Sequence, residues 1–342
     1  MRWTSCSCAD NRDRLGDFKG ASFVATQASE SREKPPAICV MGPTAAGKTQ
    51  FALDLSDRFS STLINVDSAQ VYRGMDIGTG KPDVTTQRQY PHRLMDIRDP
   101  SEIYSASEFR ADAIKEMSES LATGKTPVLV GGTMLYFKVL RDGLAAMPNA
   151  NPRVREQIEA LAAESGWEAV HAELEKVDPE SATRIHPNDP QRLQRALEVF
   201  LLTGKSLTAL HRENHTPAEL PCRLYFLAIQ PTERAVLHNR ISERFRRMLS
   251  QGLVEEVRAL TERGDLNLSM SSMKSVGYRQ VWRYLAGELT HNEMIEKSVV
   301  ATRQLAKRQL TWLRGWPALR PLGEPDKNSV DEVLKILETA AP

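Results

Sequence analysis

The feature that most constrains the fold is a glycine-rich stretch near the N-terminus, which reads Gly42-Pro43-Thr44-Ala45-Ala46-Gly47-Lys48-Thr49. An apolar run, residues 37–41, precedes it, and an amphipathic run, residues 50–59, follows it. A buried strand before the loop and a helix after it are the context in which G-x-x-x-x-G-K-[ST] binds phosphate. The glycines let successive backbone N–H groups point inward, and the helix adds its positive N-terminal end. The sequence therefore predicts a phosphate-binding loop in an α/β fold.

We expect all eight of these residues, Gly42 to Thr49, to hold the phosphates of a diphosphate or nucleotide. Lys48 supplies a point charge for the outer phosphate, and the Thr49 hydroxyl is placed to bind Mg²⁺, the expected cofactor. A glycine turn without a ligand is the alternative, and the matching strand and helix argue against it. The loop alone does not distinguish a nucleotide from another diphosphate.

The composition is that of an ordinary globular protein: of 342 residues, 26% are charged and 41% hydrophobic. No apolar run approaches the roughly 20 residues that span a bilayer, so we expect no membrane role. The four cysteines, Cys6, Cys8, Cys39 and Cys222, match neither a C-x-x-C pair nor a zinc spacing, which indicates reduced thiols in a cytoplasmic protein. The net charge of +1 gives no overall argument for nucleic acid, so such an argument depends on where basic residues cluster.

Two polar residues follow further apolar strands. Asp67 ends the run 62–67, and Thr133 follows the run 126–132. Ligands bind at the carboxyl edge of an open α/β sheet, so both side chains should face one cleft. Asp67 is a general base, a Mg²⁺ ligand of the Walker-B type, or a helix N-cap, and Thr133 is a cleft residue, an N-cap, or both. A glycine-rich polar stretch, residues 68–82, should lie over the same edge.

Shorter signals mark other elements. Residues 91–97 resemble a short strand, and Ser105 opens a helix with the S-x-x-E spacing of a capping box.

Basic residues gather in two helical regions. In residues 144–221, a predicted helical insertion, Arg153 and Arg155 follow Asn151-Pro152, and Arg192 and Arg195 share one helix face near its positive end. In the C-terminal helices, cations alternate with apolar residues at helical spacing near Tyr278, Trp312 and Trp316. Such a stripe suits RNA contact by charge and stacking, although solvated arginines and core aromatics are the plainer interpretation of each residue alone.

The expected organisation is a P-loop-type parallel sheet flanked by helices, built from residues 36–143 and 222–316, with the insertion at 144–221. Residues 1–35 lack both the apolar core of a secretory signal and the acid-poor composition of a transit peptide, so we expect a disordered extension. Residues 317–342 are expected to form a C-terminal tail.

Taken together, these blocks resemble the tRNA dimethylallyltransferases, the isopentenyl-tRNA transferase family. Besides the loop, the matching blocks are Asp67-Ser68-Ala69-Gln70, Gly74 to Thr79, Gly131 to Tyr136, His186 to Asp189 with Arg192 and Arg195, Val276 to Gln280, and Thr302 to Gln309. They cover about residues 37–316, and their joint occurrence is far more specific than the loop alone.

The resemblance implies transfer of the dimethylallyl group of dimethylallyl diphosphate to the exocyclic amine of the adenosine 3′ to the anticodon, with release of diphosphate. It makes Asp67 the general base, Thr133 a positioning residue, and Arg155 a contact to the diphosphate from the insertion. It implies binding of the tRNA anticodon stem-loop. We expect a monomer. The expected tRNA contacts are Asp67, Ser68, Ala69, Gln70, Gln191, Arg192, Leu193, Gln194, Arg195, Lys274, Gly277, Tyr278, Arg279, Arg303, Lys307 and Arg308.

Two other functions remain open at this stage. A nucleoside or nucleotide kinase of the P-loop class would need neither the block after Asp67 nor the basic C-terminal helices. A non-catalytic RNA-binding ATPase would leave Asp67 as a Mg²⁺ ligand.

Overall fold

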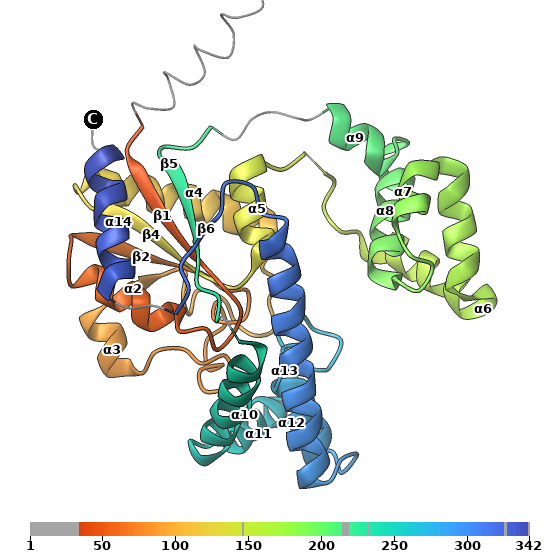
Figure 1. Cartoon of the computed structure of the whole chain (residues 1–342). Helices are drawn as coiled ribbons and strands as arrows, with labels where there is room; N and C mark the ends of the chain where they lie inside the picture. Colours follow the sequence, from red (N-terminus) through yellow and green to blue (C-terminus); the bar gives the residue numbers. More distant parts are fainter. Residues whose placement is uncertain (1–33, 146, 214–218, 232, 325–326, 341–342) are drawn as a thin grey trace, which may run out of the picture.

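The centre of the molecule is a parallel sheet. The computed structural model describes residues 34–145, 147–213, 219–231, 233–324 and 327–340. In this part of the chain six strands pair in the order β3-β2-β4-β1-β5-β6, every neighbouring pair being parallel. They are β1 (Pro36–Met41), β2 (Ser61–Val66), β3 (His92–Arg93), β4 (Thr126–Gly131), β5 (Arg223–Ala228) and β6 (Arg320–Pro321). Figure 1 shows helices on both sides of the sheet, which confirms the predicted α/β class.

Helices cover both faces of this sheet, so its central strands are apolar without alternation. Apolar residues of α2 (Lys48–Ser56), α4 (Ala106–Ala122) and α5 (Met134–Asp142) are buried in the clusters around the sheet, whereas α3 (Val84–Gln89) has no buried residue. Ile38 and Cys39 of β1 are both fully buried but belong to different apolar clusters. Phe109 and Phe137 pack with Cys39, and Phe51 packs with Ile38.

Two local expectations have different outcomes. The predicted capping box is confirmed, since the Ser105 side chain accepts from the Glu108 N–H and the Glu108 carboxylate accepts from the Ser105 N–H. The predicted strand over residues 91–97 shrinks to His92–Arg93. Leu94 and Asp96 have φ of 60° and 56°, in the left-handed region, which an extended strand does not tolerate.

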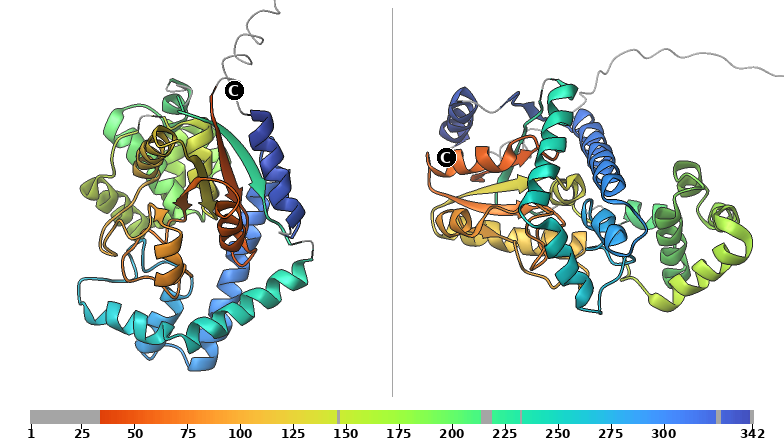
Figure 2. Two further views of the ribbon diagram at one scale, coloured as in Figure 1. Left: turned by 90° about the vertical axis from the view of Figure 1, so that its left-hand side faces the viewer. Right: turned by 90° about the horizontal axis from the view of Figure 1, so that it is seen from below.

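The insertion forms a small helical unit of its own. It contains α6 (Pro152–Val177), α7 (Pro179–Arg184), α8 (Pro190–Thr203) and α9 (Leu207–Glu213). These helices pack on one another around residues such as Ile158, Leu174 and Leu193. Figures 1 and 2 show that the insertion lies on the far side of α5 and α13 from the sheet.

The C-terminal helices lie beyond the carboxyl end of the sheet. They are α10 (Arg234–Ser250), α11 (Leu253–Glu262), α12 (Tyr278–Leu285) and α13 (His291–Arg314), and α13 runs back alongside α5. None of the helices within the described ranges has the length and apolar character to cross a bilayer.

The segment expected to be only a tail contributes to the core. Its strand β6 pairs with β5, and the Leu322 N–H donates to the Ala228 carbonyl at 2.8 Å. The helix α14 (Lys327–Ala340) buries Val330 and Val333 in the same apolar cluster as Phe51. The apolar face of this helix thus covers one side of the sheet.

Candidate active site

The phosphate-binding loop connects β1 to α2 and has the backbone of a binding loop. Gly47, at the N-cap of α2, has φ of 93°, in the left-handed region where glycine is favoured. Gly42 passes so close to the Ile229 carbonyl that a Cβ atom would lie 2.6 Å from its oxygen. The Lys48 ammonium donates to the Pro43 carbonyl at 2.7 Å, which curls the side chain over the loop.

Asp67 and Thr133 follow β2 and β4, which are neighbours in the sheet, and the structure brings them together. The Asp67 carboxylate accepts from the Ala69 N–H at 2.9 Å in a turn, so Asp67 caps no helix. The Thr133 hydroxyl makes no capping bond to α5 and instead accepts from the Ser68 N–H at 3.0 Å. Of the two interpretations of Thr133, the structure therefore favours the cleft residue.

The cleft is a cavity of about 550 Å³ at the carboxyl edge of the sheet. It is lined by residues that follow β1, β2, β3 and β4 and by residues of α10, α13 and the connection before α12. The expected site residues in its wall are Thr44, Lys48, Thr49, Asp67, Ser68, Ala69, Gln70, Thr133, Lys274, Gly277 and Arg308. The wall thus joins a phosphate-binding loop, a carboxylate and basic side chains in one space.

Burial and neighbouring charges shift the pKa values of two cations in this cavity. Burial lowers the pKa of the Lys48 ammonium to about 8; the negative charge of Asp67 opposes this change and the positive charge of Arg244 adds to it. Burial likewise lowers the pKa of the Arg244 guanidinium, against the effect of Asp67. Arg244 reaches the cavity from α10 and donates to the Thr79 carbonyl at 3.2 Å. The Asp67 carboxylate thus acts electrostatically on two buried cations, Lys48 and Arg244.

Gln309 connects the phosphate-binding loop to the turn after β4. It was not expected as a site residue. From α13 its carbonyl oxygen accepts from the Thr44 N–H at 2.9 Å, and its amide donates to the Gly132 carbonyl at 2.9 Å. The side chain is 7% exposed. Gln309 and Arg244 belong to basic helical stretches, and nothing in the sequence indicates which residues of those helices face the loop.

The glycine-rich stretch after Asp67 is held by a second unexpected residue, Glu256 of α11. Its carboxylate accepts from the N–H groups of Asp76, Ile77 and Gly78 at 2.9, 2.7 and 3.1 Å. The Tyr278 hydroxyl donates to the same carboxylate at 2.5 Å. Burial, together with the charge of Glu256, raises the pKa of the Tyr278 phenol well above its usual range. The loop over the cavity is therefore fixed by α11 and α12.

Two of the expected tRNA contacts have buried side chains. Tyr278 is 0% exposed, so its ring is not available to stack on a base. Leu193 is also 0% exposed and belongs to the core of the insertion. Both lie in basic segments, but helix packing turns these two side chains inward.

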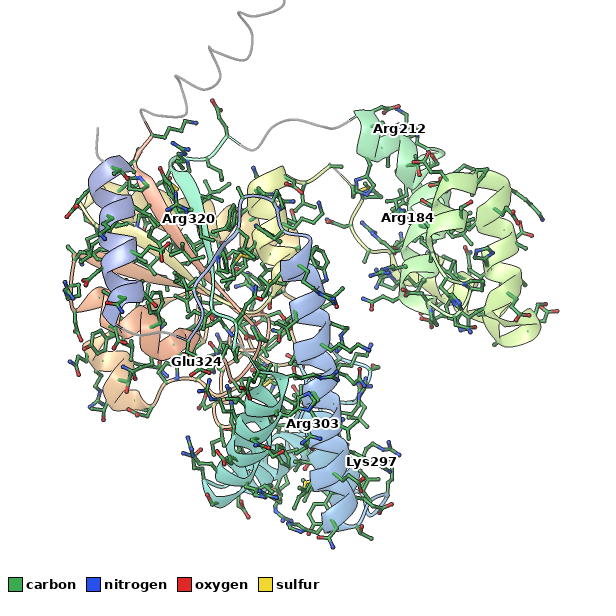
Figure 3. The ribbon with its side chains drawn as sticks, in the orientation of Figure 1. Arg184, Arg212, Lys297, Arg303, Arg320 and Glu324 are labelled. Carbon is green, nitrogen blue, oxygen red and sulfur yellow. The ribbon has the colours of Figure 1, made fainter. Side chains whose placement is uncertain are left out.

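The remaining basic residues lie outside the cavity wall. Arg303 of α13 donates to the Ser242 hydroxyl at 3.1 Å, whereas Arg279 and Lys307 are exposed. In the insertion, Arg192 pairs with its N-cap Asp189, and Gln191 and Gln194 are exposed and half-exposed. Figure 3 shows Arg303 well separated from Arg184 and Arg212 of the insertion. The two basic regions are therefore distinct surfaces.

Arg155 is also outside the cavity wall. Its guanidinium donates to Glu198 of α8 at 2.9 and 3.2 Å, and Arg195 donates to the same carboxylate at 2.8 Å. Arg155 was expected to reach the diphosphate from the insertion, and in the structure it does not line the cavity that contains the phosphate-binding loop.

The residues present suit Mg²⁺ only together with a phosphorylated ligand. Thr49 and Asp67 offer hard oxygen donors in the cavity wall. Among the described residues no group of three or more His, Cys, Asp or Glu side chains could hold a metal ion unaided. Since Mg²⁺ favours octahedral oxygen coordination and is often bound by a few protein oxygens plus phosphates, this donor set fits it.

Comparison with known proteins gives one consistent result. The family model described as IPP transferase matches residues 70–316. The full-length tRNA isopentenylpyrophosphate transferase of Bacillus halodurans is 34% identical, with a TM-score of 0.65, over 90% of this chain and 97% of that one. The Staphylococcus epidermidis tRNA delta(2)-isopentenylpyrophosphate transferase is 31% identical, with a TM-score of 0.64, over 90% and 100%. A eukaryotic dimethylallyltransferase acting on tRNA is 26% identical, with a TM-score of 0.75, over 89% and 79%.

Proposed function

The chain belongs to the IPP transferase family, and we propose that its prenyl transfer to tRNA uses dimethylallyl diphosphate as donor and the exocyclic amine of the adenosine 3′ to the anticodon as acceptor. The observation that supports this most is the presence of the phosphate-binding loop, Asp67 and Thr133 in the wall of one cavity. In this proposal the loop binds the diphosphate leaving group, and the Asp67 carboxylate takes the proton of the attacking amine. A monomer in the cytoplasm is part of the same proposal.

The donor half of the reaction breaks the bond between the allylic carbon and the diphosphate oxygen. The electron pair of that bond leaves with the diphosphate, so negative charge grows on its oxygens. Backbone N–H groups of the loop and the Lys48 ammonium stabilise this charge. Mg²⁺ held by Thr49 with the diphosphate would add further neutralisation.

The acceptor half forms a bond from the adenine amine nitrogen to the same carbon. Lone-pair delocalisation into the ring makes this amine a weak nucleophile, and it must lose a proton as the bond forms. Asp67 accepts that proton, and the Thr133 hydroxyl, which already binds the Ser68 N–H, orients the reactants. The products are the alkylated amine, diphosphate and a protonated carboxyl group that returns its proton to water.

The acceptor base must leave the stack of the anticodon loop to reach Asp67. A stacked base cannot present its amine to a carboxylate inside a cavity, whereas an extruded base can enter it. Unpaired bases in loops are the usual target of sequence-specific RNA recognition. Basic side chains at the mouth, Arg308 and Lys274, would hold the RNA backbone during this step.

The test is incubation of the protein with labelled dimethylallyl diphosphate, Mg²⁺ and unmodified tRNA, with ATP and a nucleoside in a parallel reaction. We expect label in the tRNA without ATP, at the adenosine next to the anticodon. Phosphorylation of the nucleoside with no label in the tRNA would identify a kinase. ATP hydrolysis stimulated by tRNA, with neither product, would identify an RNA-binding ATPase.

A further inference from the structure

A buried carboxylate in the insertion has no part in the reaction described above. Glu198 of α8 has a side chain that is 0% exposed. One of its oxygens accepts from the Asn151 N–H at 2.8 Å and from Arg155 Nε at 2.9 Å. The other accepts from Arg155 Nη2 at 3.2 Å and from Arg195 Nη1 at 2.8 Å. Both oxygens are thus fully used by the first turn of α6 and by α8.

Packing alone does not explain a carboxylate at this position. A buried ion pair is weak evidence for stability, because apolar side chains of similar volume often serve as well. Burial by itself raises the pKa of Glu198, but hydrogen bonds from Arg155, Arg195 and the Asn151 backbone bring it below its ordinary value. The group therefore stays ionised, and what the ion pairs add is a defined direction for two guanidinium groups.

Each of these two guanidinium groups keeps N–H donors that Glu198 does not use. Arg155 donates from Nε and Nη2 to Glu198, which leaves both N–H groups of Nη1 and the second N–H of Nη2. Arg195 donates from Nη1 to Glu198 and from Nη2 to the Pro148 carbonyl, each at 2.8 Å, which leaves the Nε–H and one N–H on each terminal nitrogen. The side chains remain 40% and 33% exposed, respectively. Two positive charges held by one negative charge leave a net positive site at the surface.

We propose that Glu198 joins Arg155 and Arg195 into a single site for one phosphoryl group, with Glu198 as the positioning residue. The sequence suggested separate ligands, the donor diphosphate for Arg155 and tRNA for Arg195, but a shared carboxylate makes the two side chains one unit. Planar guanidinium groups fixed in this way bind phosphate oxygens with defined geometry. The inference rests on the proposed function, because the donor and the RNA backbone of that reaction are the two sources of such a group.

A double-mutant cycle tests the coupling. Arg155→Ala, Arg195→Ala and the double variant are compared for binding of tRNA and, separately, of dimethylallyl diphosphate with Mg²⁺. Each single change should weaken one of these bindings about tenfold, as expected for one lost charge-assisted hydrogen bond. The double variant should lose little more than either single one, and the binding that changes identifies the source of the phosphate. Additive losses of about a hundredfold, or no loss with either ligand, would overturn the proposal.

Glu198→Gln tests the positioning role directly. It should weaken the same binding as the arginine variants and have no further effect in the double arginine background. The matched control is Glu180→Gln, because Glu180 pairs with Arg212 in the same insertion, where the two side chains are 60% and 72% exposed. This control should bind both ligands as the wild type does.

Other results separate the possible failures. Loss of both bindings together with a lower melting temperature would make Glu198 purely structural and refute the positioning role. If Glu198→Gln does not fold, the double-mutant cycle of Arg155 and Arg195 still tests whether the two arginines form one site. Prenyl transfer by the wild type is measured in parallel: an inactive wild type refutes the proposed function, whereas an active wild type with additive arginine effects refutes only this site.

Discussion

Replacement of Gln309 by Ala should loosen the phosphate-binding loop although the residue carries no charge. The side chain bridges the Thr44 N–H and the Gly132 carbonyl, at 2.9 Å each, and so ties the loop after β1 to the turn after β4. A Cβ atom on Gly132 would overlap this amide, so the packing is tight. Gln309→Ala removes both bonds and leaves a backbone donor and acceptor without a protein partner.

The expected loss of stability follows from the Thr44 N–H and the Gly132 carbonyl, which both lose their hydrogen-bond partner. Each buried group left unsatisfied costs about 1–3 kcal/mol, and water entering the space left by the side chain recovers part of this. We expect a loss of about 2–4 kcal/mol in the free energy of unfolding of the core. Affinity for dimethylallyl diphosphate should fall as well, because the loop is no longer held in one conformation, whereas tRNA affinity should change less.

Urea unfolding and donor binding by calorimetry measure the two quantities. Gln304→Ala is the matched control, because Gln304 is an exposed glutamine of the same helix. Gln309→Glu separates the two bonds, since a carboxylate can accept from Thr44 but cannot donate to Gly132. If Gln309→Ala unfolds at the same urea concentration as Gln304→Ala and binds the donor as tightly, the bridge does not organise the loop.

Three further predictions concern the cavity. Asp67→Asn should lower the single-turnover rate about 10²–10⁴-fold with tRNA and donor binding nearly unchanged, and recovery of the rate at raised Mg²⁺ would instead make Asp67 a metal ligand. The Lys48 pKa of about 8 means that donor binding above this pH must take up a proton. The apparent Kd for dimethylallyl diphosphate should therefore rise about tenfold per pH unit above pH 8, and a constant Kd from pH 7 to about 9.5 would contradict this. Trp312 lines the cavity and is 39% exposed, so Trp312→Ala should weaken binding of an anticodon stem-loop by about 1–3 kcal/mol, whereas an equal loss of donor affinity would place the ring on the prenyl group.

Some of this site is determined by short stretches of sequence. The loop from Gly42 to Thr49 needs a strand, two glycines and a helix in direct succession, and all of these are local. Asp67 and Thr133 share a cavity because each follows a buried strand, and parallel strands end at one edge of a sheet. Periodicity, capping and turn chemistry act over a few residues, so the sequence alone specifies them.

Other parts were decided only by tertiary packing. Gln309 and Arg244 come from helices far along the chain, and the rotation of each helix determines which polar residue meets the loop. The same rotation buries Tyr278 and Leu193, which belong to stretches as basic as those that remain exposed. When a helix has charged residues on several faces, its sequence does not predict which face will be buried. The apolar surface of the neighbouring element determines the buried face. For the same reason the link between Arg155 and Arg195 became visible only when α6 and α8 were brought together around Glu198.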